Sequence, residues 1–317
     1  MIVSRQFLER LVLLLVSSLI MYYISVKIIE ETNGMDISSS ASDLKKLKAK
    51  IDTKGLDLNL HEKSLVGHIV YPEDIDISFN DIGGLSGLKE RLEKVLFKPL
   101  TLTGDNLGPL FNPPNGIILH GSPGTGKTMI AKAIAKKLDG IFISCGPSLF
   151  ENKFYGESAK LIKGLFSFAN KVKPCVIFID EIDGILGTRN DFDQSLVNET
   201  KTIFLAEMDG IIARNPQVIF VGATNKLYSI DKAVKRRMRL HVEVPLPDLE
   251  SRRNILELHL KKYDLDLEAV LKDTEAFSGS DLFELCKLAG LEAIAQDRKN
   301  ITEGDLQCAL ELLTSSG

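Results

Sequence analysis

The segment Gly121–Thr128 (GSPGTGKT) constrains the fold of this chain more than any other feature. It follows a short apolar run, Gly116–His120, and precedes residues 129–138, whose apolar side chains have helical spacing. A strand, a glycine-rich turn and a helix in this order place backbone N–H groups and the positive end of the helix around phosphate groups. We therefore expect an α/β domain with a phosphate-binding loop formed by Gly121, Ser122, Pro123, Gly124, Thr125, Gly126, Lys127 and Thr128.

Two side chains of this loop are predicted to carry its chemistry. Lys127 should contact the β and γ phosphates of ATP, and Thr128 should ligate Mg²⁺. The alternative, an ordinary glycine-rich turn, requires that the strand before it and the helix after it match by chance. The loop therefore predicts a nucleotide site with ATP and Mg²⁺ as its cofactors.

Two acidic residues end a second apolar run. Cys175–Ile179 is followed directly by Asp180 and Glu181, at the end of a strand where parallel sheets bind their ligands. Adjacent acids after a strand are commonly a solvated turn, but downstream of a phosphate-binding loop they are the expected second half of the site. We predict that Asp180 holds Mg²⁺ through its water shell and that Glu181 polarises the attacking water.

A third apolar run, Val218–Thr224, ends at Asn225, a neutral side chain that can orient water or sense the γ-phosphate. Beyond it, Arg236 and Arg237 lie near the end of a short predicted helix. Such a pair by itself stabilises the C-terminal end of a helix through its dipole. Beside a nucleotide site, the two residues instead indicate arginine fingers that act on a neighbouring subunit.

The start of the chain predicts a membrane anchor. Leu11–Val26 is uncharged, and as a helix it would be about 24 Å long, short of a hydrocarbon core of ~30 Å unless Lys27, Ile28 and Ile29 join it. The alternative is a cleaved signal peptide, for which the run is long and no Ala-x-Ala site follows closely. Positive charges on both sides leave the orientation open. Because ATP is cytosolic, we place the ATPase domain of a single-pass protein in the cytosol.

Composition excludes other classes of function. The net charge of −4 provides no electrostatic footprint for nucleic acid, so no nucleic-acid partner is expected. The four cysteines form no Cys-x-x-Cys pair or zinc-binding spacing, which is typical of reduced cytosolic thiols. His61 begins a sequence like a zinc-protease motif, but Leu65 stands where the second histidine is needed. A fused protease is therefore disfavoured.

Apolar and helical stretches alternate along the middle of the chain. The predicted strands near residues 117–120, 141–144, 175–180, 217–222 and 240–244 indicate a parallel sheet flanked by helices. After Pro247 only helical patterns follow. We predict an anchor (1–30), a linker (31–78), a large α/β domain (79–247) and a small helical lid domain (248–317), with ATP in the cleft between sheet and lid.

The chain resembles the AAA ATPase family across about residues 79–317. The resemblance is carried by the motifs GSPGTGKT, VIFIDEID, VGATN and KAVKRRM. Phe79–Leu85 resembles the family's segment whose backbone near Ile82 and Gly83 lines the adenine pocket. Phe277–Cys286 resembles the helical-lid signature of the subgroup that contains katanin, spastin, Vps4 and Msp1. An N-terminal anchor, a short linker and a single AAA+ module are most similar to the Msp1 (ATAD one) extractases of that subgroup.

The resemblance implies a homo-hexamer with ATP between subunits and substrate in a central channel. Phe154, Tyr155 and Gly156 match the pore-loop segment that grips an extended polypeptide, although ordinary loop aromatics are the alternative. A second channel loop is expected near Gly187–Asp193. Two departures from the subgroup stand out: Phe154 replaces a tryptophan, and His241 stands where another arginine is usual. His259 could approach adenine as in some relatives, although a solvated helix histidine is the preferred interpretation.

The implied function is extraction of mislocalised tail-anchored membrane proteins. The expected location is the mitochondrial outer membrane, with peroxisomes and the endoplasmic reticulum left open. A microtubule-severing or membrane-remodelling enzyme of the same subgroup is the alternative, but it needs a recognition domain for which the linker has little room. The third hypothesis is a scaffold that binds ATP without hydrolysing it. It is disfavoured by the presence of the predicted catalytic residues Asp180, Glu181, Arg236 and Arg237.

Overall fold

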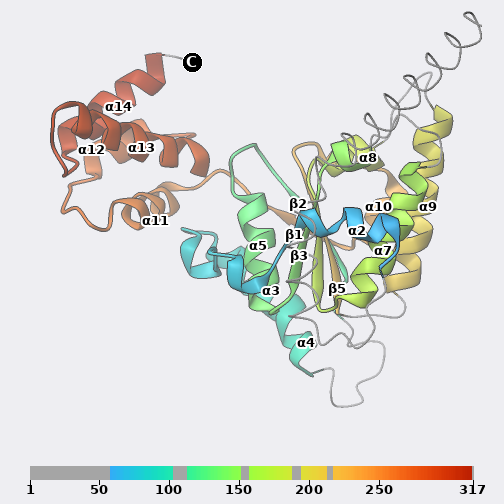
Figure 1. The fold of residues 1–317 in the computed structure, drawn as a ribbon. Coiled ribbons are helices and arrows are strands. Elements are labelled where there is room, and N and C mark those ends of the chain that lie inside the picture. The colour runs from blue at the N-terminus through green and yellow to red at the C-terminus, as the bar shows by residue number, and fades with distance from the viewer. Residues whose placement is uncertain (1–57, 103–112, 151–156, 188–193, 213–216, 316–317) are drawn as a thin grey trace, which may run out of the picture. The chain divides into compact units, whose positions relative to one another are not determined.

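The computed structural model describes residues 58–102, 113–150, 157–187, 194–212 and 217–315 (Figure 1). The predicted anchor Leu11–Val26 and the predicted pore-loop residues Phe154, Tyr155 and Gly156 lie outside these ranges, as does most of the second predicted channel loop. Within the described ranges, every helix is too short or too polar to cross a bilayer. The membrane anchor and the pore loop therefore stay predictions.

The chain divides into two units, residues 1–67 and 68–317. The first contains α2 (Leu60–Ser64), which begins with a capping box. The Asn59 side chain accepts a hydrogen bond from the Glu62 amide at 2.9 Å, and the Glu62 carboxylate accepts one from the Asn59 amide at 2.8 Å. These reciprocal bonds satisfy donors that a helix start otherwise leaves unpaired. Part of the predicted linker is therefore helical.

The second unit is built on a six-stranded sheet with the order β1-β3-β4-β5-β2-β6. The strands are β1 (Ile69–Val70), β2 (Gly116–His120), β3 (Ile141–Cys145), β4 (Cys175–Ile179), β5 (Val218–Thr224) and β6 (Leu240–Glu243). The strands β2 to β6 pair with one another in parallel, as predicted.

The edge strand β1 pairs antiparallel with β3, so the sheet is mixed and the prediction of a wholly parallel sheet was wrong at this edge. Two residues are too few for an alternating pattern, which is the signal that identifies a strand in sequence. Ile69 and Val70 also lie in the segment expected to be a linker.

Helices cover both faces of the sheet (Figure 1). On one face, α5 (Lys127–Lys137) packs on alternate strand residues such as Ile117 and Leu119. On the other face lie α7 (Glu157–Lys171) and α9 (Gln194–Ile212). There Phe166 of α7 stacks on Phe220 of β5 with ring centroids 5.2 Å apart, and Phe204 of α9 meets Phe166 edge-on at 5.1 Å. Burial on both faces explains why the central strands β2, β4 and β5 are nearly continuous apolar runs.

Shorter elements connect this framework. Before β2, α3 (Ser86–Leu92) continues through a π-helical turn at Glu93–Phe97 into α4 (Lys98–Leu102). The remaining helices of the large domain are α6 (Pro147–Phe150), α8 (Ile182–Leu186) and α10 (Lys232–Arg237). Single 3₁₀ turns occur at Val66–His68, Pro72–Asp74, Phe79–Asp81 and Leu227–Ser229.

The C-terminal part is the predicted helical lid. It consists of α11 (Leu249–Leu260), α12 (Glu268–Asp273), α13 (Gly279–Ala295) and α14 (Glu303–Ser315). These helices share a core of their own, with buried residues that include Leu256, Leu282, Leu285, Leu306 and Leu310. A separate core lets the lid move as a body relative to the sheet.

Candidate active site

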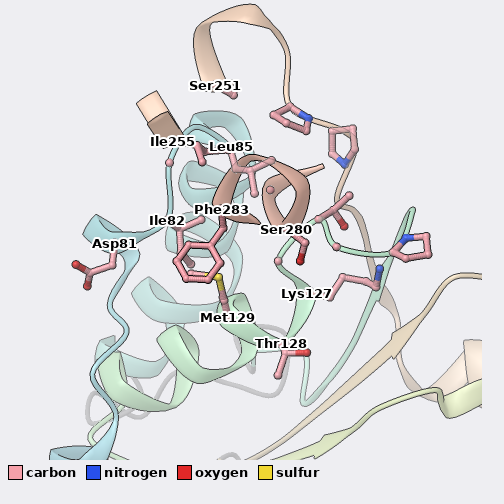
Figure 2. A pocket seen from close by; sticks show the side chains of 18 of the residues that line it. Asp81, Ile82, Leu85, Lys127, Thr128, Met129, Ser251, Ile255, Ser280 and Phe283 are labelled. Atoms are coloured by element: carbon pink, nitrogen blue, oxygen red, sulfur yellow. The ribbon is translucent and has the colours of Figure 1, made fainter. Parts of the chain in front are cut away.

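A pocket of about 620 Å³ lies where the carboxyl ends of β4 and β5 meet the lid (Figure 2). Its walls come from five places: the segment from Asp81 to Leu85, the glycine-rich loop with the start of α5, the residues that follow β4 and β5, Pro245 and Pro247 between β6 and α11, and the lid helices α11 and α13. The volume falls in the range of about 300–1,000 Å³ that is usual for small-molecule sites.

The glycine-rich loop is shaped by backbone that only glycine adopts easily. Gly121 has φ +149°, and a Cβ there would lie 2.1 Å from the carbonyl oxygen of Val244. Gly124 has φ +72°, and a Cβ there would lie 2.5 Å from the Ser278 Oγ of the lid. The loop is thus held closely between the end of β6 and the lid. Of the predicted loop residues, 123–128 line the pocket, whereas Gly121 and Ser122 are not among its lining residues.

Lys127 opens α5 and bonds the loop that precedes it. Its Nζ donates to the carbonyl oxygens of Gly121 at 3.0 Å and Ser122 at 2.7 Å. Burial lowers the pKa of Lys127, and the nearby Asp180 carboxylate opposes that shift. Lys127 and Thr128 both line the pocket (Figure 2). The α5 N-terminus and this ammonium therefore make one end of the pocket an anion-binding site.

The two predicted acids follow β4 directly and both line the pocket. The Asp180 amide donates to the Cys145 carbonyl at 3.0 Å, which continues the pairing of β4 with β3. The Asp180 Oδ1 accepts from the Glu181 amide at 3.0 Å. Glu181 has left-handed backbone, φ 46° and ψ 46°, which costs a non-glycine residue on the order of 1–2 kcal/mol. This strained turn exposes both carboxylates on the polar side of the pocket.

Asn225 also lines the pocket, and the residue before it, Thr224, was not predicted from the sequence to take part in the site. Thr224 is 2% exposed. Its Oγ1 donates to the Asp183 Oδ1 at 2.7 Å and accepts from the Lys226 amide at 2.9 Å. The Thr224 hydroxyl therefore ties the end of β5 to α8, just after Glu181. Its signal in the sequence was a hydroxyl at the end of an otherwise apolar strand.

Ile82 and Gly83 line the opposite, apolar end of the pocket. The Nζ of Lys89 in α3 donates to the Ile82 carbonyl at 2.6 Å, and burial lowers the pKa of Lys89. A Cβ on Gly83 would lie 2.6 Å from the Ile255 Cγ1, so this segment packs tightly on lid helix α11. Ile82 and Gly83 were predicted from the sequence, whereas Lys89 and Ile255 were not, because long-range packing leaves no local pattern.

His259 is exposed, as expected for a solvated helix histidine. It also lines the pocket. Its ring centroid lies 5.0 Å from that of Phe283, with a tilt of 57° between the rings. Desolvation lowers the pKa of His259, so the imidazole is neutral near pH 7. Phe283, which the sequence analysis did not single out, lines the same apolar end.

Arg236 and Arg237 lie at the end of α10 and are not among the residues that line this chain's pocket. Arg237 forms a two-pronged ion pair with Asp209 of α9, at 2.7 Å from Nε and 2.6 Å from Nη2. This pair raises the pKa of Arg237 and lowers that of Asp209. The Arg236 side chain is exposed. Their action on a neighbouring subunit stays a prediction, and of the two Arg236 is the more accessible.

His241, the predicted departure, lies in β6 with its Nε2 buried and without a hydrogen-bond partner among the described residues. His241 is therefore a half-buried residue of the sheet, and the effect of this departure on a contact to a neighbouring subunit stays a prediction.

Comparison with known proteins agrees with this architecture. Residues 117–247 match the AAA family (ATPase family associated with various cellular activities), and residues 264–308 match the AAA+ lid domain. The chain is 37% identical over 287 residues to an outer mitochondrial transmembrane helix translocase of Danio rerio, covering 86% of this chain and 79% of the relative.

Relatives from other animals have a similar identity to this chain. The Homo sapiens outer mitochondrial transmembrane helix translocase is 38% identical over 258 residues, covering 79% of this chain and 71% of that protein. The mitochondrial sorting homolog of Caenorhabditis elegans is 34% identical over 275 residues, covering 84% and 80%. The chain therefore belongs to the AAA ATPase family, in the branch that contains the outer mitochondrial transmembrane helix translocases.

Proposed function

We propose that this ATPase uses Mg²⁺ and ATP in the pocket described above to pull proteins out of a membrane. The observation that carries the proposal is the meeting of Lys127, Thr128, Asp180, Glu181 and Asn225 in one pocket, in a chain whose relatives are named transmembrane helix translocases. The pocket supplies the chemistry, and the relatives indicate the kind of work that the chemistry drives.

The side chains at the polar end divide the chemical tasks. Lys127 and the α5 N-terminus neutralise phosphate charge. The Thr128 hydroxyl and the Asp180 carboxylate are oxygen donors of the kind that Mg²⁺ takes, and both line the pocket, so they fit as its ligands. Bound Mg²⁺ supplies charge neutralisation on the phosphates. Glu181 accepts a hydrogen bond from the attacking water, and Asn225 orients that water.

The lid contacts the nucleotide site directly, which provides a route from chemistry to movement. The Ser280 amide of α13 donates to the Gly124 carbonyl of the loop at 3.0 Å. On the other side of the pocket, Gly83 packs on Ile255 of α11. A change in the loop during hydrolysis therefore acts directly on α13, while the contact of Gly83 with α11 holds the lid at a second point, so the angle between lid and sheet changes with the loop.

Anchoring at the membrane and grip on the substrate depend on segments outside the described residues. Leu11–Val26 would hold the ATPase at the membrane, and Phe154, Tyr155 and Gly156 would grip the substrate in the channel of a homo-hexamer. Arg236, the more accessible arginine, would complete the site of the next subunit, with Arg237 supporting it. The names of the relatives support the mitochondrial outer membrane as the location and transmembrane helices as what is moved. Mislocalised tail-anchored proteins are the substrate class that we propose.

A substrate-trapping experiment tests the proposal. Glu181→Gln should bind ATP, fail to hydrolyse it, and co-purify with tail-anchored membrane proteins when the full-length chain is isolated from detergent-solubilised mitochondria. Lys127→Ala in the same background should abolish both nucleotide binding and the capture of these proteins. Capture that persists in the double variant, or that is limited to soluble or cytoskeletal proteins, would count against extraction.

A further inference from the structure

Phe283 is a large apolar side chain that the fold leaves 52% exposed. It lies in the second turn of α13, close to Gly279 and Ser280, which also line the pocket. The Ser280 amide is bonded to the Gly124 carbonyl at 3.0 Å, so this end of α13 is held beside the glycine-rich loop. Phe283 itself lines the pocket, and Figure 2 shows its ring there.

The residues around Phe283 make this end of the pocket apolar. Ile82, Met129, Ile255 and Leu258 line it with Phe283, and the ring points toward Ile82 and Met129 in Figure 2. His259 contacts Phe283 with ring centroids 5.0 Å apart. The opposite end carries the charged side chains described above. A ligand that fits both ends has an anionic tail and a flat, mostly apolar ring.

We propose that the base of the bound nucleotide stacks on the Phe283 ring, with His259 supporting that ring from the side. This rests on the proposed nucleotide binding at the loop. Stacking of a base on an aromatic side chain strengthens binding by about 5- to 150-fold. Because Phe283 belongs to the lid and Lys127 to the sheet domain, a complete nucleotide contacts both, whereas a triphosphate without a base does not reach Phe283.

The absence of tryptophan from the chain permits a direct test. Phe283→Trp creates a protein whose only tryptophan is at the stacking position. Its fluorescence should change on titration with Mg²⁺-ATP and stay constant on titration with Mg²⁺-tripolyphosphate. Leu291→Trp is the matched control, because Leu291 lies on the same helix, is 53% exposed and does not line the pocket. Its fluorescence should respond to neither ligand.

Calorimetry with the full-length chain measures the contribution of the ring. Phe283→Ala should raise the Kd for ATP by about 5- to 150-fold and leave the Kd for tripolyphosphate unchanged. Phe283→Tyr keeps an aromatic face and should bind ATP within about twofold of the wild type. Phe283→Leu keeps an apolar side chain without the face and should bind ATP more weakly than the tyrosine variant.

Three results would overturn the stacking. Phe283→Ala could bind ATP as tightly as the wild type does, or more tightly, which would show that the ring contributes nothing or fills the space of the base. Phe283→Ala could lose affinity for ATP and for tripolyphosphate equally, which would show a general effect on the loop. Phe283→Trp fluorescence could respond equally to both ligands. In each case wild-type ATP binding would remain, whereas a wild-type chain that binds no ATP would instead refute the proposed function.

Discussion

Replacing Thr224 by valine removes one hydroxyl while keeping the shape of the side chain. In the structure this hydroxyl donates to the Asp183 Oδ1 at 2.7 Å and accepts from the Lys226 amide at 2.9 Å. The first bond fixes α8 just beyond Glu181, and the second closes the turn that contains Asn225. Thr224→Val therefore loosens two candidate catalytic residues without altering the glycine-rich loop.

The magnitude follows from the two bonds. A hydrogen bond to a charged group contributes about 1.5–3 kcal/mol and a neutral one about 0.5–1.5 kcal/mol. Asp183 is partly exposed and Lys226 is exposed, so water replaces part of what is lost. We expect the free energy of unfolding to fall by about 1–3 kcal/mol, which lowers Tm by about 2–4 °C for each kcal/mol in a protein of this size. Misplacement of Glu181 and Asn225 should lower kcat by about 10- to 100-fold.

Steady-state ATP hydrolysis and thermal unfolding of the full-length chain would measure both effects. KM for ATP should change by less than about threefold, because the residues that contact the phosphates keep their positions. Thr224→Ser retains the hydroxyl and is the matched control, with kcat within about threefold of the wild type. The reasoning would be refuted if Thr224→Val hydrolysed ATP at the wild-type rate, or if the serine variant lost as much activity as the valine variant.

Three further predictions concern other contacts. Gly121→Ala places a methyl group 2.1 Å from a backbone carbonyl oxygen at φ +149°, so it should abolish ATP binding in calorimetry; unchanged affinity would contradict the loop geometry. Lys89→Met removes the 2.6 Å bond to the Ile82 carbonyl, and should weaken ATP binding by about 5-fold or more while leaving tripolyphosphate binding unchanged in the same assay. Arg298 lowers the pKa of Asp305 below its unfolded value of about 3.9, so this pair stabilises the lid above that pH and the stabilisation is lost as the pH falls further. Asp305→Asn should therefore lower Tm at pH 7 and reduce the loss of Tm between pH 5 and pH 2.5, and equal acid sensitivity in both proteins would exclude this origin.

Local patterns were enough to predict most of the framework. The central strands β2, β4 and β5 are buried on both faces, so each is a nearly continuous apolar run that can be recognised in the sequence. The glycine-rich loop and the acids after β4 are contiguous, and their spacing carries their chemistry. By contrast, β1 is only two residues long and takes its direction from pairing with β3, so the sequence could not indicate that the sheet is mixed.

The sequence by itself thus determined the class of the domain, the phosphate-binding loop and the pocket-lining acids Asp180 and Glu181, because each depends on neighbours in the chain. Tertiary structure decided which distant side chains serve that loop. Thr224 reaches Asp183 across 41 positions of the chain, and Phe283 and His259 join the pocket only because two lid helices pack beside one another. Contacts between residues far apart in the chain leave no periodic signal, so only the folded arrangement shows that the loop's pocket has an aromatic wall.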